Sequence, residues 1–83
     1  MLPFSEKGET RTFSHNVNPD ELKGHRDRED RAITPVGSND WMFQRDNSLP
    51  EPIDHEIKIQ SGEWHRVIKG TTDLVVRVQK GAV

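Results

Sequence analysis

The chain has 83 residues, a length that allows for one domain. Only 30% of the residues are hydrophobic and 31% are charged, so the core must be small, and a bound metal ion or a second copy of the chain would supplement its stability. The net charge of −2 gives no electrostatic support for binding nucleic acid or an anionic membrane, and no apolar run is long enough to span a bilayer. Because the chain has no cysteine, disulfides and thiolate chemistry are excluded.

The N-terminal part of the chain is polar. Residues 1–10 are interrupted by proline and glycine, so we expect a flexible arm there and the folded domain over residues 11–83. The arm lacks the basic start and apolar stretch of a signal peptide, and we expect a cytoplasmic protein. Residues 11–17 are predicted to form a weak edge strand. Asn18 and Pro19 then have the order of a helix N-cap and first helical position, and Gly24 follows soon, which predicts one short helical turn.

From residue 31 onwards the sequence is typical of short strands separated by turns. The predicted strands cover residues 31–36, 41–45, 53–60, 64–69 and 74–79. The segment 49–52 is predicted to be extended but not central in a sheet, because proline has no backbone donor. Short strands with frequent turns indicate an all-β sandwich or barrel.

Two histidines and an aspartate are candidates for a metal site. His25 and Asp27 are two residues apart, so on a strand both side chains share one face. His65 follows the turn residue Gly62 by three positions and opens a β-rich segment. Two imidazoles and one carboxylate are the ligand set of non-haem Fe(II) centres. If two strands meet here, the sequence predicts a site for a divalent transition metal such as Fe, Mn, Ni or Zn.

Structural roles compete with this hypothesis. His65 could be an interior histidine that is hydrogen-bonded to a neighbour. Asp27 could pair with Arg31 or Arg66, and Glu29 could replace it as the carboxylate. These alternatives stay open at the level of sequence.

The remaining histidines and aromatic residues have simpler expected roles. His15 and His55 lie in polar surroundings and should be exposed. Trp41 and Phe43 share one face of a strand and should belong to the core. Trp64 should point away from His65, and an outward tryptophan suggests a contact in a homodimer.

The segment Gln60–His65 resembles the second motif of the cupin superfamily, with Gln60 in place of the family's proline and His65 in place of its metal-binding histidine. The preceding residues 41–50 resemble the strand pair that leads to that motif. Upstream, His25-Arg26-Asp27 resembles the family's HxH, with Asp27 at the second histidine. The resemblance covers about residues 20–80 and implies a small double-stranded β-helix, that is, a cupin-like jelly-roll barrel.

The family's glutamate would fall at Arg31 or Ala32 and is missing, so the resemblance implies three protein ligands. The set is similar to the HxD…H triad of the 2-oxoglutarate oxygenases, which share this barrel type. In that family an arginine beyond the last histidine pairs with a co-substrate carboxylate, and Arg77 is the candidate here. Gln44 and Phe43 are the other candidates for contacting a small ligand.

The expected function is the binding or transformation of a small carboxylate or hydroxy acid at the metal, in a metal-dependent oxygenase or isomerase. A non-catalytic cupin-like module for binding or assembly, without metal, is the alternative and has support from the missing glutamate. Neutral histidines are required for metal binding, so activity should fall below about pH 6.5.

Overall fold

The computed structural model describes residues 2–81. Its strands are β1 (Ser5–Lys7), β2 (Thr10–Phe13), β3 (Arg31–Pro35), β4 (Met42–Arg45), β5 (Glu51–Pro52), β6 (Ile57–Ile59), β7 (His65–Ile68) and β8 (Leu74–Lys80). One short 3₁₀ helix, η1 (Pro19–Glu21), lies between β2 and β3. This short helix and the eight strands confirm the expectation of an all-β chain. No helix among the described residues has the length and hydropathy that crossing a membrane requires.

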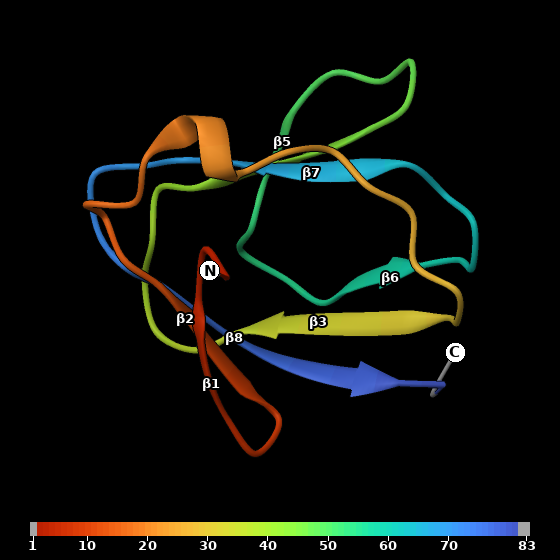
Figure 1. The fold of residues 1–83 in the computed structure, drawn as a ribbon, viewed down its shortest axis with the longest axis horizontal. Helices are drawn as coiled ribbons and strands as arrows, with labels where there is room; N and C mark the ends of the chain where they lie inside the picture. Colours follow the sequence, from red (N-terminus) through yellow and green to blue (C-terminus); the bar gives the residue numbers. More distant parts are fainter. Residues whose placement is uncertain (1, 82–83) are drawn as a thin grey trace.

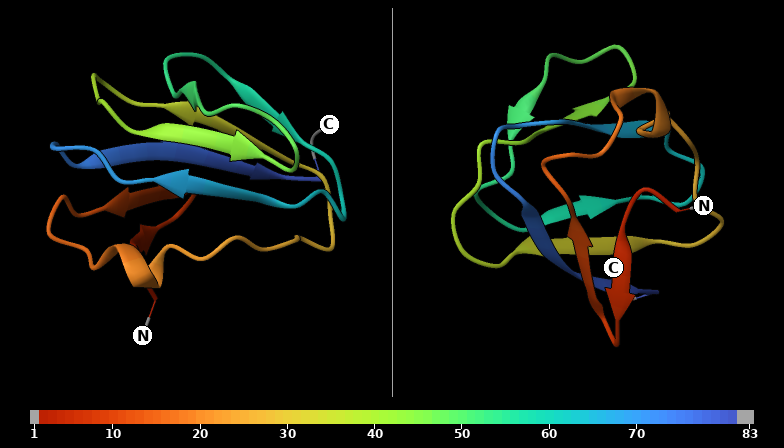
Figure 2. Two further views of the ribbon diagram at one scale, coloured as in Figure 1. Left: turned by 90° about the horizontal axis from the view of Figure 1, so that it is seen from above. Right: turned by 60° about the vertical axis from the view of Figure 1, so that its left-hand side comes forward.

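The strands form two antiparallel sheets that face one another (Figures 1 and 2). The larger sheet has the strand order β1-β2-β8-β3-β6, and the smaller has the order β5-β4-β7. An isolated bridge joins His25 to His65, and each backbone N–H donates to the other residue's carbonyl at 3.0 Å. The segment around His25 therefore runs beside β7 at the border of the smaller sheet.

Segments far apart in the sequence pair in nested order around a turn at Asn47, which has a positive φ of 56°. From the innermost pair outwards, the partners are Phe43 with Glu51, Ile33 with Ile57, His25 with His65, and Phe13 with Leu74. Successive pairs lie alternately in the smaller and the larger sheet. The chain is thus a long antiparallel hairpin that winds over itself, and this winding brings segments near residues 25 and 65 together.

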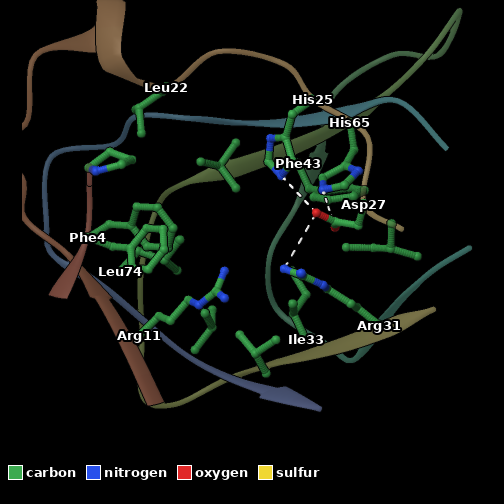
Figure 3. A pocket seen from close by; sticks show the side chains of 16 residues that line it. Phe4, Arg11, Leu22, His25, Asp27, Arg31, Ile33, Phe43, His65 and Leu74 are labelled. Atoms are coloured by element: carbon green, nitrogen blue, oxygen red, sulfur yellow. Dashed lines mark ion pairs between the residues drawn. The ribbon is translucent and has the colours of Figure 1, made fainter. Parts of the chain in front are cut away.

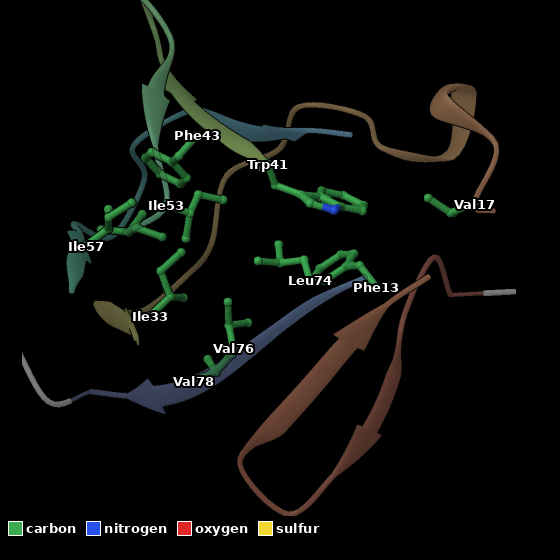
Figure 4. Close-up of a cluster of buried hydrophobic side chains, with 11 residues drawn as sticks. Phe13, Val17, Ile33, Trp41, Phe43, Ile53, Ile57, Leu74, Val76 and Val78 are labelled. Carbon is green, nitrogen blue, oxygen red and sulfur yellow. The ribbon is translucent and has the colours of Figure 1, made fainter. Parts of the chain in front are cut away.

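The hydrophobic core fills the space between the sheets (Figure 4). From β8, Leu74, Val76 and Val78 point inward at every second position. From the smaller sheet's side come Trp41 and Phe43, each 1% exposed, so their expected place in the core is confirmed. Burial of apolar side chains at this period of two is what selects one register for each strand.

Several local expectations are confirmed. Asn18 caps η1, because its side chain accepts a hydrogen bond from the Asp20 N–H at 3.0 Å, and Pro19 takes the first helical position. The proline-containing segment forms β5 at the edge of the smaller sheet. His15 and His55 are exposed.

The N-terminus differs from the expected arm of residues 1–10. Residues Ser5–Lys7 form β1, which pairs with β2 as a hairpin around Gly8. All three residues of β1 are exposed, so the strand has no apolar alternation by which to recognise it. Its pairing is set by the backbone and by an ion pair from Arg11 Nε to Glu6 at 2.6 Å. Met1 of the expected arm, and residues 82–83 of the expected domain, lie outside the described residues.

Candidate metal centre

His65 is the first residue of β7 and sits just after the turn at Gly62. Gly62 has a positive φ of 80°, which glycine adopts without strain. The turn is tied to the segment that carries Asp27: the Gly62 N–H donates to the Asp27 carbonyl at 2.8 Å, and Arg26 Nη1 donates to the Gly62 carbonyl at 2.6 Å. The turn thereby fixes where His65 enters the sheet relative to Asp27.

The three predicted ligands meet in space. The ligand atoms of His25, Asp27 and His65 all lie within 4.8 Å of one another. His25 Nε2 is 3.4 Å from Asp27 Oδ1, and His65 Nε2 is 3.3 Å from Asp27 Oδ2. Figure 3 shows both imidazoles turned towards the carboxylate. The two-residue spacing of His25 and Asp27, together with the bridge from His25 to His65, produces this convergence.

The protons of the two imidazoles can be assigned from their other partners. His65 Nδ1 lies 2.9 Å from the Glu63 carbonyl, and His25 Nδ1 lies 3.3 Å from the Lys23 carbonyl. A carbonyl accepts only, so in a neutral ring Nδ1 carries the proton and donates, and Nε2 holds a lone pair. Both lone pairs then face the Asp27 carboxylate, which also only accepts. In this tautomer three acceptors converge on one point, and the group could hold a metal ion.

Burial disfavours a positive charge on the His65 ring. The residue is only 5% exposed, and burial is the main reason that the pKa of His65 is lowered from 6.5. Its ring is therefore neutral near pH 7. Neutral imidazole with Nδ1–H held by a backbone carbonyl is the usual state of a metal-bound histidine. The donor set fits a divalent transition metal, and His25, whose side chain is more than half exposed, leaves the site open to solvent on one side.

A cavity of about 120 Å³ adjoins the three ligands. Phe43 forms part of its wall and stacks on His65 with 5.6 Å between ring centroids. Apolar side chains of both sheets line most of the rest, and the charged exceptions besides the ligands are Arg11 and Arg31 (Figure 3). Arg31 Nη1 approaches Asp27 Oδ1 at 3.5 Å.

Of the predicted ligand-binding residues, the structure brings Phe43 to the cavity but not Gln44 or Arg77. Gln44 follows Phe43 in β4 and donates to the Ser48 carbonyl while accepting from Arg66. Arg77 is exposed on β8 between the buried Val76 and Val78. Neither lines the cavity, because adjacent residues of a strand point to opposite faces.

The alternatives left open by the sequence are resolved in part. Glu29 is exposed and is not among the grouped ligands, whereas Asp27 is. The arginine beside Asp27 is Arg31, since Arg66 is bound to Gln44. Trp64 is half-buried against Gly24, where a side chain on Gly24 would overlap its ring.

Sequence reasoning missed Arg11 as a cavity residue. The signal was its two-residue spacing from Phe13, which places both side chains on the same face of β2. Arg31 was considered only as a partner of Asp27, not as part of a binding surface. No protein-family model, curated protein or solved structure matches the chain.

Proposed function

We propose that this chain is a cupin-like barrel protein that holds one divalent transition-metal ion with His25, Asp27 and His65. The observation that carries the proposal is the convergence of three candidate ligand atoms within 4.8 Å of one another, next to a cavity. Unpaired acceptors on the buried side chains of His65 and Asp27 are costly, and a cation would remove that cost.

The cupin-like part of the proposal is supported by the nested strand pairing. A hairpin whose successive pairs fall alternately into two antiparallel sheets is the winding of a jelly roll. His25 and Asp27 lie on one segment and His65 lies on β7 beside it, which supports the use of these three residues as the ligands. Geometry and motif thus agree on the same three residues.

The chemistry of such a site follows from its open positions. Three protein ligands leave room for exogenous oxygen donors, and a bound metal would act as a Lewis acid or an O₂-binding centre for a small carboxylate or hydroxy acid. The protein's own residues shape the site: Phe43 holds the His65 ring by stacking, and the Glu63 carbonyl fixes its tautomer. We propose a metal-dependent oxygenase or isomerase on this basis.

A second candidate is a metal-free module for binding or assembly. The observation in its favour is the contact between Arg31 and Asp27, because a guanidinium can neutralise the carboxylate without a metal. At 3.5 Å that contact is longer than a charge-assisted hydrogen bond, and it leaves the imidazole lone pairs unopposed. The metal-bound form is therefore the better supported of the two.

Metal binding is tested directly on the purified protein after treatment with a chelator. Calorimetric titration with Fe(II), Mn(II), Ni(II) or Zn(II), and thermal unfolding with and without each ion, should reveal one site per chain for at least one of them. The variants His25→Ala and His65→Gln should lose that site. His25 is exposed, so its variant should fold even if the buried His65 variant does not.

The matched control is His55→Ala. His55 also lies beside two carboxylates, 2.6 Å from Asp54 and 3.8 Å from Glu51, but on the surface. It should bind metal as the wild type does. Absence of stoichiometric binding and of thermal stabilisation in the wild type would favour the metal-free module, and equal loss in all three variants would point to non-specific binding by surface histidines.

A further inference from the structure

We propose that Arg45 is a positioning residue of the metal centre, which acts through Glu63 and Phe43 to hold the His65 ring in the tautomer and orientation that a metal ion needs. Neither Arg45 nor Glu63 lines the cavity, so both act on the ligand from behind rather than on the ion. The inference rests on the proposed function, because it concerns the same centre, but it can be tested in metal-free protein.

Arg45 ends β4 directly opposite His65, the first residue of β7. Side chains of directly opposite residues in an antiparallel pair lie on the same face of the sheet. The guanidinium makes three contacts there: Nη1 donates to Glu63 Oε1 at 2.7 Å, Nη2 donates to the Lys58 carbonyl at 2.9 Å, and the group lies over the Phe43 ring, 5.2 Å from its centroid. Arg45 thereby joins β4 to β6 and to the turn that precedes His65.

Glu63 is held through both its side chain and its backbone. Its carboxylate accepts from the Gln60 N–H at 3.2 Å as well as from Arg45, and its own N–H donates to the Gln60 carbonyl at 3.1 Å. The side chains of Arg45 and Glu63 are each only 29% exposed, so solvent screens this ion pair less than a surface pair. These bonds fix the direction of the Glu63 carbonyl, which lies 2.9 Å from His65 Nδ1 and keeps the proton on that nitrogen.

Phe43 provides the second route from Arg45 to His65. Its ring contacts the Arg45 guanidinium and also stacks on the His65 ring, with 5.6 Å between centroids and 22° between planes (Figure 3). A cation over a ring face is attracted by the quadrupole of the ring, so Arg45 restrains Phe43. The stacked Phe43 ring in turn restrains the plane of the imidazole.

His25 is supported more weakly than His65. Its Nδ1 lies 3.3 Å from the Lys23 carbonyl, a longer contact, and its side chain is more than half exposed. The tautomer of an imidazole is set by the hydrogen bonds that its nitrogens make. His65 is therefore the ligand that the fold prepares before metal arrives, and removal of Arg45 should change the state of His65 but not that of His25.

The experiment measures ¹⁵N NMR signals of the imidazole nitrogens in metal-free protein at pH 8, where both rings are neutral. In the wild type the His65 proton should be on Nδ1. Arg45→Met should move part of the population to the Nε2–H tautomer and leave the His25 signals unchanged. Calorimetric titration should then show metal binding weakened by about tenfold or more, as for loss of an outer partner of a ligand.

Companion variants separate positioning from a merely structural role, which would lower stability without changing the tautomer. Glu63→Ala should act as Arg45→Met does, and the double variant should lose little more, because the two residues work as a unit. Glu63→Gln keeps an acceptor oxygen and should restore most of the Nδ1–H population. Arg45→Lys keeps the charge without the planar fork and should give an intermediate result, even if Arg45→Met fails to fold.

Arg66→Met is the matched control. Arg66 follows His65 in β7, but it is exposed and donates to Gln44. This variant should keep the tautomer and the metal affinity of the wild type. An unchanged His65 tautomer in Arg45→Met and Arg45→Lys, or equal changes in Arg66→Met, would overturn the inference.

Failure of the proposed function has a separate signature. If the wild type binds no metal but Arg45→Met still shifts the His65 tautomer, the positioning role stands and the metal function falls. If the wild type binds metal and neither the tautomer nor the affinity depends on Arg45, the metal function stands and the positioning role falls.

Discussion

Two carboxylates join distant parts of this chain, and their surroundings are opposite. Asp40 accepts hydrogen bonds from the backbone N–H groups of Thr71 and Thr72 at 2.8 and 3.2 Å, and from the Thr71 hydroxyl at 2.5 Å. These bonds, the Thr71 hydroxyl first, lower the pKa of Asp40 from 3.8 to about 2. Thr71 and Thr72 thus supply several donors to this carboxylate, which is satisfied without an ion.

Asp27 has the reverse arrangement. Two imidazole nitrogens face it at 3.4 and 3.3 Å, and both of their rings direct Nδ1 to a backbone carbonyl instead. The comparison teaches that the kind of neighbour separates the two carboxylates. Donors around Asp40 make a structural clamp, whereas the imidazole nitrogens beside Asp27 form with it a group that could hold a metal ion.

The largest expected effect separates the two carboxylates by metal affinity. Asp27→Asn removes a charged ligand and should weaken metal binding by more than about 100-fold, beyond the 10–100-fold typical of losing an outer partner of a ligand. Asp40→Asn should leave metal affinity unchanged, because Asp40 is outside the metal group. Calorimetric titration of both variants makes the measurement, and equal affinities for the two would contradict the assignment of Asp27.

Two glycines test the supports of the two carboxylates. A Cβ on Gly70 would lie 2.8 Å from the Asp40 carbonyl carbon. A Cβ on Gly24, the residue before His25, would overlap the Trp64 ring. Gly70→Ala and Gly24→Ala should each cost about 1–3 kcal/mol of unfolding free energy, as overpacking does. Only Gly24→Ala should also weaken metal binding, since it displaces the segment that carries His25. Urea unfolding and metal titration of each variant measure the two effects. An unchanged stability in Gly70→Ala would show that the segment around Asp40 can shift to accommodate the added Cβ.

These contrasts also show what could be predicted from sequence and why. The candidate metal site could be predicted from sequence because each part of it depends on a short segment of the chain. His25 and Asp27 share a face by their two-residue spacing, and Gly62 places His65 at the start of a strand. The same period of two places Gln44 and Arg77 on outward faces, since Phe43 and Val76 are buried neighbours.

Other features could not be predicted because they depend on long-range pairing. The hairpin of β1 and β2 contains no apolar alternation in its outer strand, and it joins the sheet through the pairing of β2 with β8, far along the chain. The spacing from Phe13 places Arg11 on the inward face of β2, but the position of β2 beside the cavity depends on its pairing with β8. The donors around Asp40 likewise come from residues about thirty positions away.

In the metal-free protein, replacing each carboxylate by an amide should affect stability differently. In Asp27→Asn the new amide N–H₂ can donate to one imidazole lone pair, so the variant should be as stable as the wild type in chelator or up to about 1.5 kcal/mol more stable, the range of one hydrogen bond. Asp40→Asn should instead lower the melting temperature, because it weakens charge-assisted bonds from Thr71 and Thr72. Thermal unfolding in chelator at pH 8 makes this comparison. A clear loss of stability in Asp27→Asn would mean that Arg31 and the imidazoles already satisfy the carboxylate.

The smallest expected effect is a pH dependence that distinguishes the two regions in metal-free protein. Burial lowers the folded-state pKa of His65 below its ordinary 6.5, so between these two pKa values the unfolded chain binds more protons than the folded one. Stability should therefore be complete above pH 6.5 and fall as the pH drops below it, by at most about 1.4 kcal/mol per pH unit for one proton.

The Asp40 contribution has its own window. Because the pKa of Asp40 is lowered from 3.8 to about 2, its contribution is present above pH 3.8 and is lost only as the pH falls from there towards 2. Urea unfolding from pH 8 to pH 3 in chelator should thus show a first decline that His65→Gln removes and a second, more acidic one that Asp40→Asn reduces. If His65→Gln leaves the first decline unchanged, then the buried imidazole is already paired with a proton-donating neighbour. That result would contradict the assignment of a free Nε2 lone pair that can bind a metal ion.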